Sequence, residues 1–415
     1  MDEKIKLNTA NADLRAAFEP AAYEPEKTKA PKRKYAAMFA GGVVGIIGGV
    51  ACILYAVLAG GAELSEINFP DMSSSEQGDA TYSTLTGEVL ADASQKNAPI
   101  YCIQTPNGTD GARPQAGLTE AGVIFEAVAE AGITRFAAIY QNPKTAIIGP
   151  IRSLRIYYLE WDTPFDCTIV HAGGSGDALA TVAAGGYKDL SEDYSYMYRG
   201  TYSSRLWNNL FTTSTALEKF STSHGYDSAN AKGFARMTPE ESERARVDTL
   251  ATEKLDITKA ASGNTSALSA TVNNVALRFG GLASFNVNYS YDATTNRYTR
   301  GYESGAAHDV YDCAREDLGE KNPEDVCTLT QMTPSVVVAM MVSESRASDN
   351  YHEDITTVGS GRAYIFQNGT AVEGSWRKDS VADQIKFLDA DGNEVRLAPG
   401  QTIVSAIPNY GSVEY

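Results

Sequence analysis

The longest hydrophobic stretch of the chain covers residues 35–62 and contains no charged side chain. Three consecutive cations, at positions 32–34, stand directly before it. About 20 apolar residues are enough for a helix to cross the hydrocarbon core of a bilayer, so the stretch predicts a single membrane-spanning helix over 35–61. The positive-inside rule then predicts a cytoplasmic, disordered tail over 1–34 and an extracytoplasmic position for everything after the helix.

Other interpretations of this stretch stay open. A cleaved signal peptide or a buried core helix would also be apolar, although the 34-residue lead and the length of the run favour a membrane anchor. Cys52 could carry a lipid, since the residues around it are similar to a lipoprotein cleavage box, but the apolar run continues beyond this cysteine. Gly41, Gly45 and Gly49 share one face of the predicted helix, which favours close approach of a second copy and a homodimer.

Residues 62–96 are rich in Ser, Asp, Glu and Gly and predict an extracytoplasmic linker. From residue 97 onward, short apolar runs alternate with amphipathic ones. This alternation predicts a parallel sheet with crossover helices, and hence a layered α/β domain over 97–255. The predicted strands are 100–103, 135–140 and 167–171, and the predicted helices are 119–131, 153–161 and 176–184.

The pattern changes to period-two alternation after a polar join near residues 256–274. Short β-like runs separated by Asn, Asp and Gly turns predict a mainly antiparallel, β-rich domain over 256–415. The fold class is therefore α+β: a membrane-anchored, layered α/β domain with a mainly parallel sheet, followed by the β-rich domain. The predicted strands are 275–279, 285–291, 298–302, 335–342, 361–367, 372–378, 385–388, 394–397 and 402–408.

Charge and cysteine content restrict the partners, disulfides and cofactors that we expect for this protein. The chain has 52 acidic and 35 basic residues, a net charge of −17, which disfavours a nucleic-acid partner. Cys313 and Cys327 bracket an acidic loop with little apolar content, and we expect them to form a disulfide. Cys102 and Cys167 lie in apolar runs and either pair or pack as buried thiols. No Cys and His spacing is typical of zinc, and we expect no metal or other cofactor.

The candidate site gathers arginines and a glycine-rich loop. Loops that follow strand ends form the usual site of a parallel α/β sheet, and the loop after the strand at 167–171 precedes a predicted helix N-terminus. Arginine forks recognise carboxylate or phosphate groups, so the site is typical of an anion-binding cleft. The predicted ligand-binding residues are Arg113, Arg135, Arg152, Ser153, Arg155, His171, Gly173, Gly174 and Ser175.

Two alternatives to anion binding remain. In the first, the arginines are structural, with Arg135 or Arg152 paired to Glu126 or Glu130. In the second, His171 acts as a general acid or base with Glu126 as its partner.

Several of these segments resemble the bacterial YerB-like lipoprotein family, a domain of unknown function numbered 3048. The resemblance covers about residues 97–415 and implies a bacterial, envelope-facing protein without an established activity. The sequence departs from the family pattern at Ala172 and Asn208, where members tend to have histidine, and at Ala307, where they tend to have proline. Because the departures at Ala172 and Asn208 remove histidines, they argue against a histidine-based catalytic or metal site, whereas the arginines of the motifs are retained. The motifs lie at 113–118, 125–126, 132–135, 148–153, 171–175 and 209–212 in the first half, and at 291–292, 298–300, 308–309, 374–376 and 397–400 in the second.

Together these patterns predict a single-pass membrane protein whose outer part is a cell-envelope binding or scaffolding module. We expect its partners to be an anionic envelope component or small molecule, the lipid bilayer, and a second copy of the chain. The alternative is an envelope hydrolase or transferase that uses His171.

Overall fold

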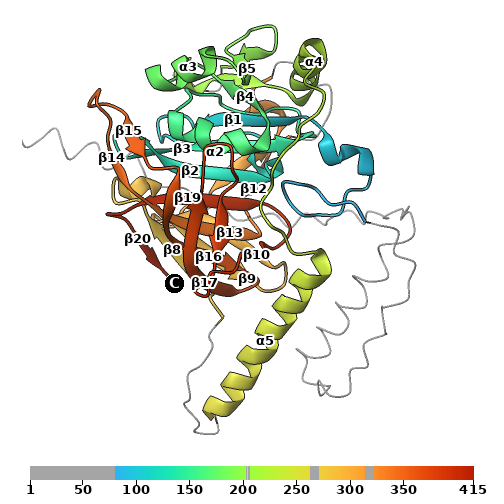
Figure 1. The fold of residues 1–415 in the computed structure, drawn as a ribbon, viewed down its shortest axis with the longest axis vertical. Coiled ribbons are helices and arrows are strands. Elements are labelled where there is room, and N and C mark those ends of the chain that lie inside the picture. Colours follow the sequence, from blue (N-terminus) through green and yellow to red (C-terminus); the bar gives the residue numbers. More distant parts are fainter. Residues whose placement is uncertain (1–79, 202, 204–205, 262–270, 314–320) are drawn as a thin grey trace, which may run out of the picture. The chain divides into compact units, whose positions relative to one another are not determined.

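The structure, a computed structural model, describes residues 80–415 apart from 202, 204–205, 262–270 and 314–320 (Figure 1). The predicted tail and the predicted spanning helix, with Cys52 and the three glycines of its face, lie outside the described residues. Within the described part, no helix combines the length and the apolar character needed to cross a bilayer. Residues 77–415 cluster as one compact unit.

A ten-stranded mixed sheet runs through this unit (Figure 1). Its order is β18-β17-β16-β13-β19-β2-β3-β1-β4-β5, so strands from both halves of the chain are neighbours. The junction is β19, which pairs in parallel with β13 on one side and with β2 on the other. The strands are β1 (Ile100–Pro106), β2 (Val123–Glu130), β3 (Ile133–Gln141), β4 (Thr168–His171), β5 (Lys188–Ser191), β13 (Val336–Val342), β16 (Gly359–Gln367), β17 (Thr370–Lys378), β18 (Lys386–Leu388) and β19 (Thr402–Pro408).

The predicted helix over 119–131 is wrong, because residues 123–130 form strand β2. Every residue of β2 is buried, since the strand lies in the middle of the sheet between β19 and β3. A short, largely apolar run of this length, here interrupted by Glu126 and Glu130, fits both a buried strand and a buried helix. Ala131 and Gly132 have φ values of 52° and 76°, which suit a tight hairpin turn into β3 rather than a helix end. The sheet is consequently mixed, and the prediction of a mainly parallel sheet is corrected: β3 pairs antiparallel with both β1 and β2.

The other strands form small antiparallel sheets, as predicted for the second half of the chain. The predicted strand at 394–397 is the exception, since Glu394 and Leu397 form only isolated bridges. The largest of these sheets has the order β10-β9-β8-β20. The remaining strands are β6 (Met197–Arg199), β7 (Leu210–Thr212), β8 (Asn274–Arg278), β9 (Val287–Asp292), β10 (Arg297–Tyr302), β11 (Asp309–Asp312), β12 (Thr328–Gln331), β14 (Glu344–Arg346), β15 (Glu353–Ile355) and β20 (Ser412–Glu414).

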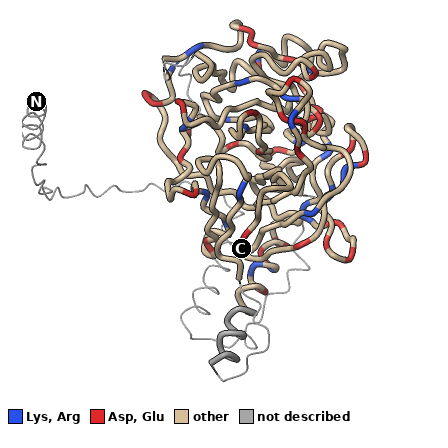
Figure 2. Tube along the Cα trace, turned by 90° about the vertical axis from the view of Figure 1, so that its left-hand side faces the viewer, with Lys and Arg blue, Asp and Glu red and all other residues tan. Residues whose placement is uncertain are grey.

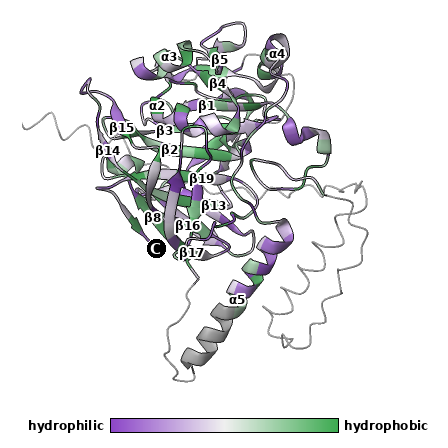
Figure 3. Ribbon diagram, viewed as in Figure 1, coloured by the Kyte–Doolittle hydropathy of each residue, from purple (hydrophilic) through white to green (hydrophobic). Residues whose placement is uncertain are grey.

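Helix α2 lies against the central strands, which are rich in hydrophobic residues (Figure 3). Trp161 of α2 stacks on Phe125 of β2, with ring centroids 5.4 Å apart. Residues of both halves share this core, and so does Leu85, so the last part of the predicted linker belongs to the folded unit. The helices are α2 (Ile156–Asp162), α3 (Gly176–Ala183), α4 (Ser214–His224), α5 (Pro239–Ala261) and α6 (Pro323–Val326).

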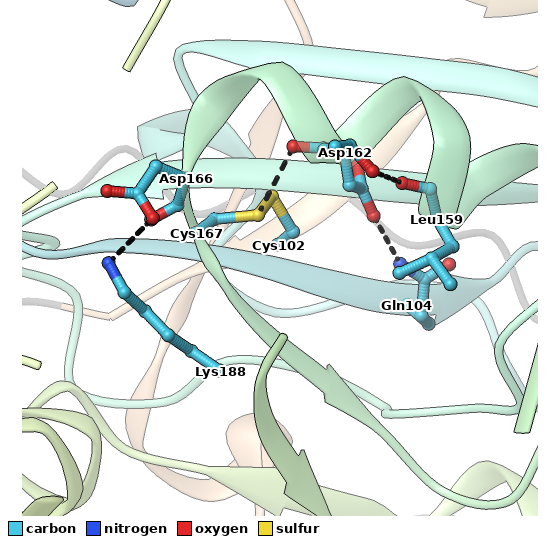
Figure 4. The surroundings of a disulfide bond; sticks show 8 residues. Cys102, Gln104, Leu159, Asp162, Asp166, Cys167 and Lys188 are labelled. Carbon is cyan, nitrogen blue, oxygen red and sulfur yellow. Dashed lines mark hydrogen bonds and ion pairs between the residues drawn. A yellow bond between two sulfur atoms is a disulfide. The ribbon is translucent and has the colours of Figure 1, made fainter. Parts of the chain in front are cut away.

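Two disulfides are formed. Cys313 and Cys327 pair, which confirms the prediction for the acidic loop. Cys102 and Cys167 also pair, with Cα atoms 5.8 Å apart, and this resolves the alternative that the sequence left open. The second bond joins β1 to the residue before β4, two neighbouring parallel strands (Figure 4). Asp162, the last residue of α2, lies beside it and accepts a hydrogen bond from Gln104.

Candidate functional site

The segment 152–155 lies between strand β1 and the loop 171–175. The backbone N–H of Arg152 donates to Gln104 O at 2.7 Å, and its carbonyl accepts from Ala172 N at 3.0 Å. Leu154 N donates to Gly173 O, and Ser175 N donates to Leu154 O, each at 3.0 Å. The structure therefore brings the arginines of this segment next to the glycine-rich loop. Cations and carboxylates are interspersed throughout the folded unit (Figure 2), so each arginine must be judged by its own partners.

Glu130 neutralises two of the arginines. Its two carboxylate oxygens accept from Arg135 Nη2 at 2.7 Å and from Arg155 Nη2 at 2.8 Å. All three side chains are almost fully buried. Burial raises the pKa of Glu130, but the two guanidinium groups outweigh it and hold this pKa below its ordinary value. Arg135 and Arg155 also donate to the carbonyls of Ser153 and Leu154, so they fasten the segment to the β2–β3 hairpin.

Replacing Glu130 with glutamine should lower the free energy of unfolding by about 3 kcal/mol at neutral pH, because two buried cations lose their counter-charge. The folded-state pKa of Glu130 lies below the unfolded one, so its stabilisation is complete above the unfolded pKa and disappears as pH falls through the folded pKa. Urea denaturation should therefore show the difference from wild type shrinking on acidification. Glu192→Gln, which breaks a partly exposed pair with Arg199, is the control and should cost less than about 1 kcal/mol. Equal losses in the two variants would contradict the assignment.

Arg152 differs from its two neighbours. Its side chain has no hydrogen-bond or ion-pair partner within the described residues, and its Nε atom is buried without a partner. Burial and the nearby Arg135 lower the pKa of Arg152 to about 10, Glu130 opposes this, and Arg155 adds to the lowering. The guanidinium therefore remains charged at neutral pH. Arg152 is partly exposed, so an anion from outside the protein can reach its guanidinium and supply the partner that the described residues do not.

His171 fastens the loop rather than projecting into an open pocket. It is 1% exposed. Its Nδ1 is 2.7 Å from Gly173 O, and its Nε2 is 2.9 Å from Asp189 Oδ1. Both ring nitrogens are thus engaged, one by backbone and one by a carboxylate on β5. A general acid or base must present a nitrogen to substrate, and this arrangement disfavours that role.

The other residues of the loop shape its backbone and make few side-chain contacts. Gly173 has a φ of 66°, a conformation that favours glycine. Gly174 pairs with Leu154 in an isolated parallel bridge. Ser175 is the residue before α3, and its buried Oγ has no hydrogen-bond partner among the described residues.

Glu126 and Arg113 belong to a separate buried network. Glu126 Oε2 accepts from Arg300 Nη2 at 2.8 Å, and both side chains are fully buried. Its Oε1 accepts from Thr134 Oγ1 at 3.0 Å. Among the described residues, no hydrogen bond joins Glu126 to His171, so the structure does not form the pair that the enzyme alternative requires. Arg113 lies over the Tyr302 ring, 4.0 Å from its centroid, and donates to Asn107 Oδ1 at 2.8 Å.

This network continues through His308. Burial and the charges of Arg300 and Arg113 hold the pKa of His308 well below its ordinary value. The ring is therefore neutral: Nδ1 accepts from Arg300 Nη1, and Nε2 donates to Gln115 Oε1 at 3.2 Å. The sequence patterns assigned no role to Arg300 or His308, although both residues lie in motifs that carry the family resemblance. Within the described residues, no group of three or more His, Cys, Asp or Glu side chains could hold a metal ion.

Comparison with known proteins identifies the family. Residues 85–227 match the family described as "Protein of unknown function (DUF3048) N-terminal domain", and residues 275–404 match its C-terminal domain. The chain belongs to the DUF3048 family. The resemblance inferred from the motifs is confirmed, and the two DUF3048 regions correspond to the two halves that share the central sheet.

This DUF3048 protein is similar to YerB in both sequence and structure. It is 26% identical over 333 residues to YerB of Bacillus subtilis (strain 168), a protein provisionally named as a lipoprotein; the match covers 78% of this chain and 86% of YerB. The crystal structure of YerB superposes with a TM-score of 0.62 at 22% identity, covering 80% of this chain and 99% of the YerB chain. At that identity, the structural match establishes the shared fold alone.

Proposed function

We propose that this protein is a membrane-anchored, extracytoplasmic binding module that recognises an anionic group of the cell envelope through Arg152. The observation that carries the proposal is that no described residue pairs with the guanidinium of Arg152, whereas Glu130 neutralises the two neighbouring arginines. A phosphate or carboxylate at this position would supply the missing counter-charge and hydrogen-bond acceptors.

The surroundings of Arg152 support a binding role. Arg135 and Arg155 add positive potential around Arg152, which the carboxylates of Glu130 and Asp110 offset in part. The loop 171–175 is held against the segment by backbone hydrogen bonds, and the His171 ring contacts Gly173 within the loop and Asp189 of β5, so the loop is already formed before any ligand arrives. A site that needs little reorganisation loses less free energy on binding.

The extracytoplasmic location has independent support. Two disulfides are typical of proteins in oxidising compartments, and the relative YerB is provisionally named as a lipoprotein. The apolar, uncharged stretch at 35–61 is the proposed anchor, with the tail 1–34 in the cytoplasm. Self-association through Gly41, Gly45 and Gly49 remains part of the proposal.

Replacing Arg152 with alanine should weaken binding of an anionic probe by about tenfold or more, since a charged hydrogen bond contributes roughly 1.5–3 kcal/mol. Purified full-length protein in detergent would be titrated with glycerol 3-phosphate and with N-acetylmuramic acid, which separate phosphate from carboxylate recognition. The melting temperature should hardly change, because Arg152 has no side-chain hydrogen bond or ion pair to lose within the described part of the chain. Arg152→Lys should keep the charge but lose the planar fork, and should bind with intermediate affinity.

Arg199→Ala is the matched control, because Arg199 already pairs with Glu192 and should not contribute to the site. Binding that survives in Arg152→Ala, or a wild-type protein that retains neither probe, would overturn the proposal. A large fall in melting temperature for Arg152→Ala would instead favour a purely structural role for the arginines.

A further inference from the structure

A second candidate site is lined by residues that were given no role in the arginine site above. A hollow of about 400 Å³ lies between the β2–β3 turn, the loop at 280–282, the β14–β15 hairpin and Tyr410, which follows β19. Val128 and Leu282 provide an apolar wall. The polar groups that line the hollow are Glu344, Arg346, Glu353 and Tyr410. Segments of both halves of the chain therefore build it.

The hollow has an excess of negative charge. Arg346 pairs with Glu353, with Nη2 and Oε1 3.8 Å apart. Glu344 has no cationic partner within the described residues: its Oε1 accepts from the Tyr410 hydroxyl, and its Oε2 is buried without a hydrogen-bond partner. Burial raises the pKa of Glu344 to about 7; the Tyr410 hydrogen bond opposes this, and Glu353 adds to it. The geometry thus leaves one oxygen of this carboxylate open to a donor from outside the protein.

The donor set selects the kind of cation. Two carboxylates and one phenol are fewer acidic ligands than Ca²⁺ prefers, and the described residues contain no group that could hold a metal. A primary ammonium group needs only a few oxygen acceptors, and its carbon chain can cover apolar surface.

We propose that this hollow binds a primary ammonium group carried on an aliphatic chain. The ammonium lies against Glu344 and Glu353, and the chain packs on Val128 and Leu282. Both a lysine-type side chain of a peptide and a free diamine have this chemistry. The site is independent of the anion site at Arg152, which has the opposite charge preference.

The test is calorimetric titration of the full-length protein in detergent. Nα-acetyl-lysine amide represents the peptide side chain, and cadaverine represents the free diamine. At least one should bind saturably at about pH 8, and binding should fall about tenfold or more in Glu344→Gln. The Nε-acetylated form of the lysine probe should not bind, because it lacks the charge. Glu373→Gln, which removes an exposed glutamate that accepts from Tyr415, is the matched control and should bind normally.

Binding should also weaken on lowering the pH to about 6, since protonation of Glu344 removes its charge while the ammonium stays protonated. The other ionisable groups that face Glu344 are Glu353, Arg346, Tyr410 and Tyr157. Burial raises the pKa of both tyrosines, so neither ionises in this range. Leu282→Ala provides a second variant and should weaken binding several-fold by removing apolar wall.

Equal affinity of wild type and Glu344→Gln, equal affinity for the acetylated probe, or binding of Ca²⁺ but of neither amine would overturn the proposal. So would the absence of saturable binding of both amines. None of these outcomes affects the anion site, whose probes and variants are different.

Discussion

Arg300→Met should lower the free energy of unfolding by about 3–5 kcal/mol, because it leaves the fully buried carboxylate of Glu126 without its cation. Arg300 also donates to Tyr289 and to the neutral His308, so the variant breaks a connected network rather than a single pair. Since Glu126 lies on β2 and Arg300 on β10, this network ties the first half of the chain to the second. Urea denaturation of the purified protein would measure the loss.

The acid dependence of the Arg300→Met variant should identify the cause. Without Arg300, burial raises the pKa of Glu126 further above its unfolded value. A group with a raised folded pKa is most favourable at low pH and loses that advantage as pH rises through the folded pKa. The variant should therefore recover part of its stability on mild acidification. Arg297→Met, which removes a neighbouring exposed arginine, should change stability by about 0.5 kcal/mol or less. A small loss in Arg300→Met, or a double variant with Glu126→Leu that is no more stable, would argue against the ion pair as the cause.

The double variant Cys102→Ala/Cys167→Ala should lose about 4 kcal/mol of stability in the chain-entropy estimate, because this disulfide closes a long loop. The cysteines are 65 residues apart, compared with 14 for Cys313 and Cys327. Removing the shorter bridge should therefore cost less, about 3 kcal/mol. Thermal or urea denaturation of both double variants would compare them directly.

The same cysteines report on the compartment. Thiol blocking in intact cells, followed by mass spectrometry, should find both pairs oxidised if the folded unit lies outside the cytoplasm. Permanently reduced cysteines would contradict the extracytoplasmic location. A loss at Cys102–Cys167 no larger than that at Cys313–Cys327 would contradict the entropy argument.

Local patterns predicted some elements well. Several strands of the second half of the chain, such as β9 and β10, alternate in polarity, and the structure confirms most of the strands predicted there within a few residues. The pattern did not distinguish strand from helix at β2, because this strand is buried on both faces and has no polar face to set the period. Because these residues form a strand rather than the predicted helix, the sheet is mixed rather than mainly parallel.

The candidate site shows the same division. The sequence located Arg135, Arg152, Arg155 and the loop 171–175. The structure places Arg152, Arg155 and this loop beside one another. The sequence did not locate the hollow around Glu344, since the lining residues are far apart in the chain and no motif connects them. A family alignment of the second half is the kind of signal that could reveal such a set.

The sequence by itself determined the family, the acidic character, the β-rich second half and the short disulfide, because these follow from composition, motifs and contacts within a few residues. The tertiary structure alone decided that residues 123–130 form strand β2, which pairs with β19 of the second half. It also decided that Glu130, rather than Glu126, neutralises Arg135 and Arg155. Finally, it decided that no residue in the described ranges pairs with the side chain of Arg152. The physical reason is that ion pairing and burial depend on which distant segments meet in the folded chain, and one carboxylate that satisfies two arginines leaves none for the third.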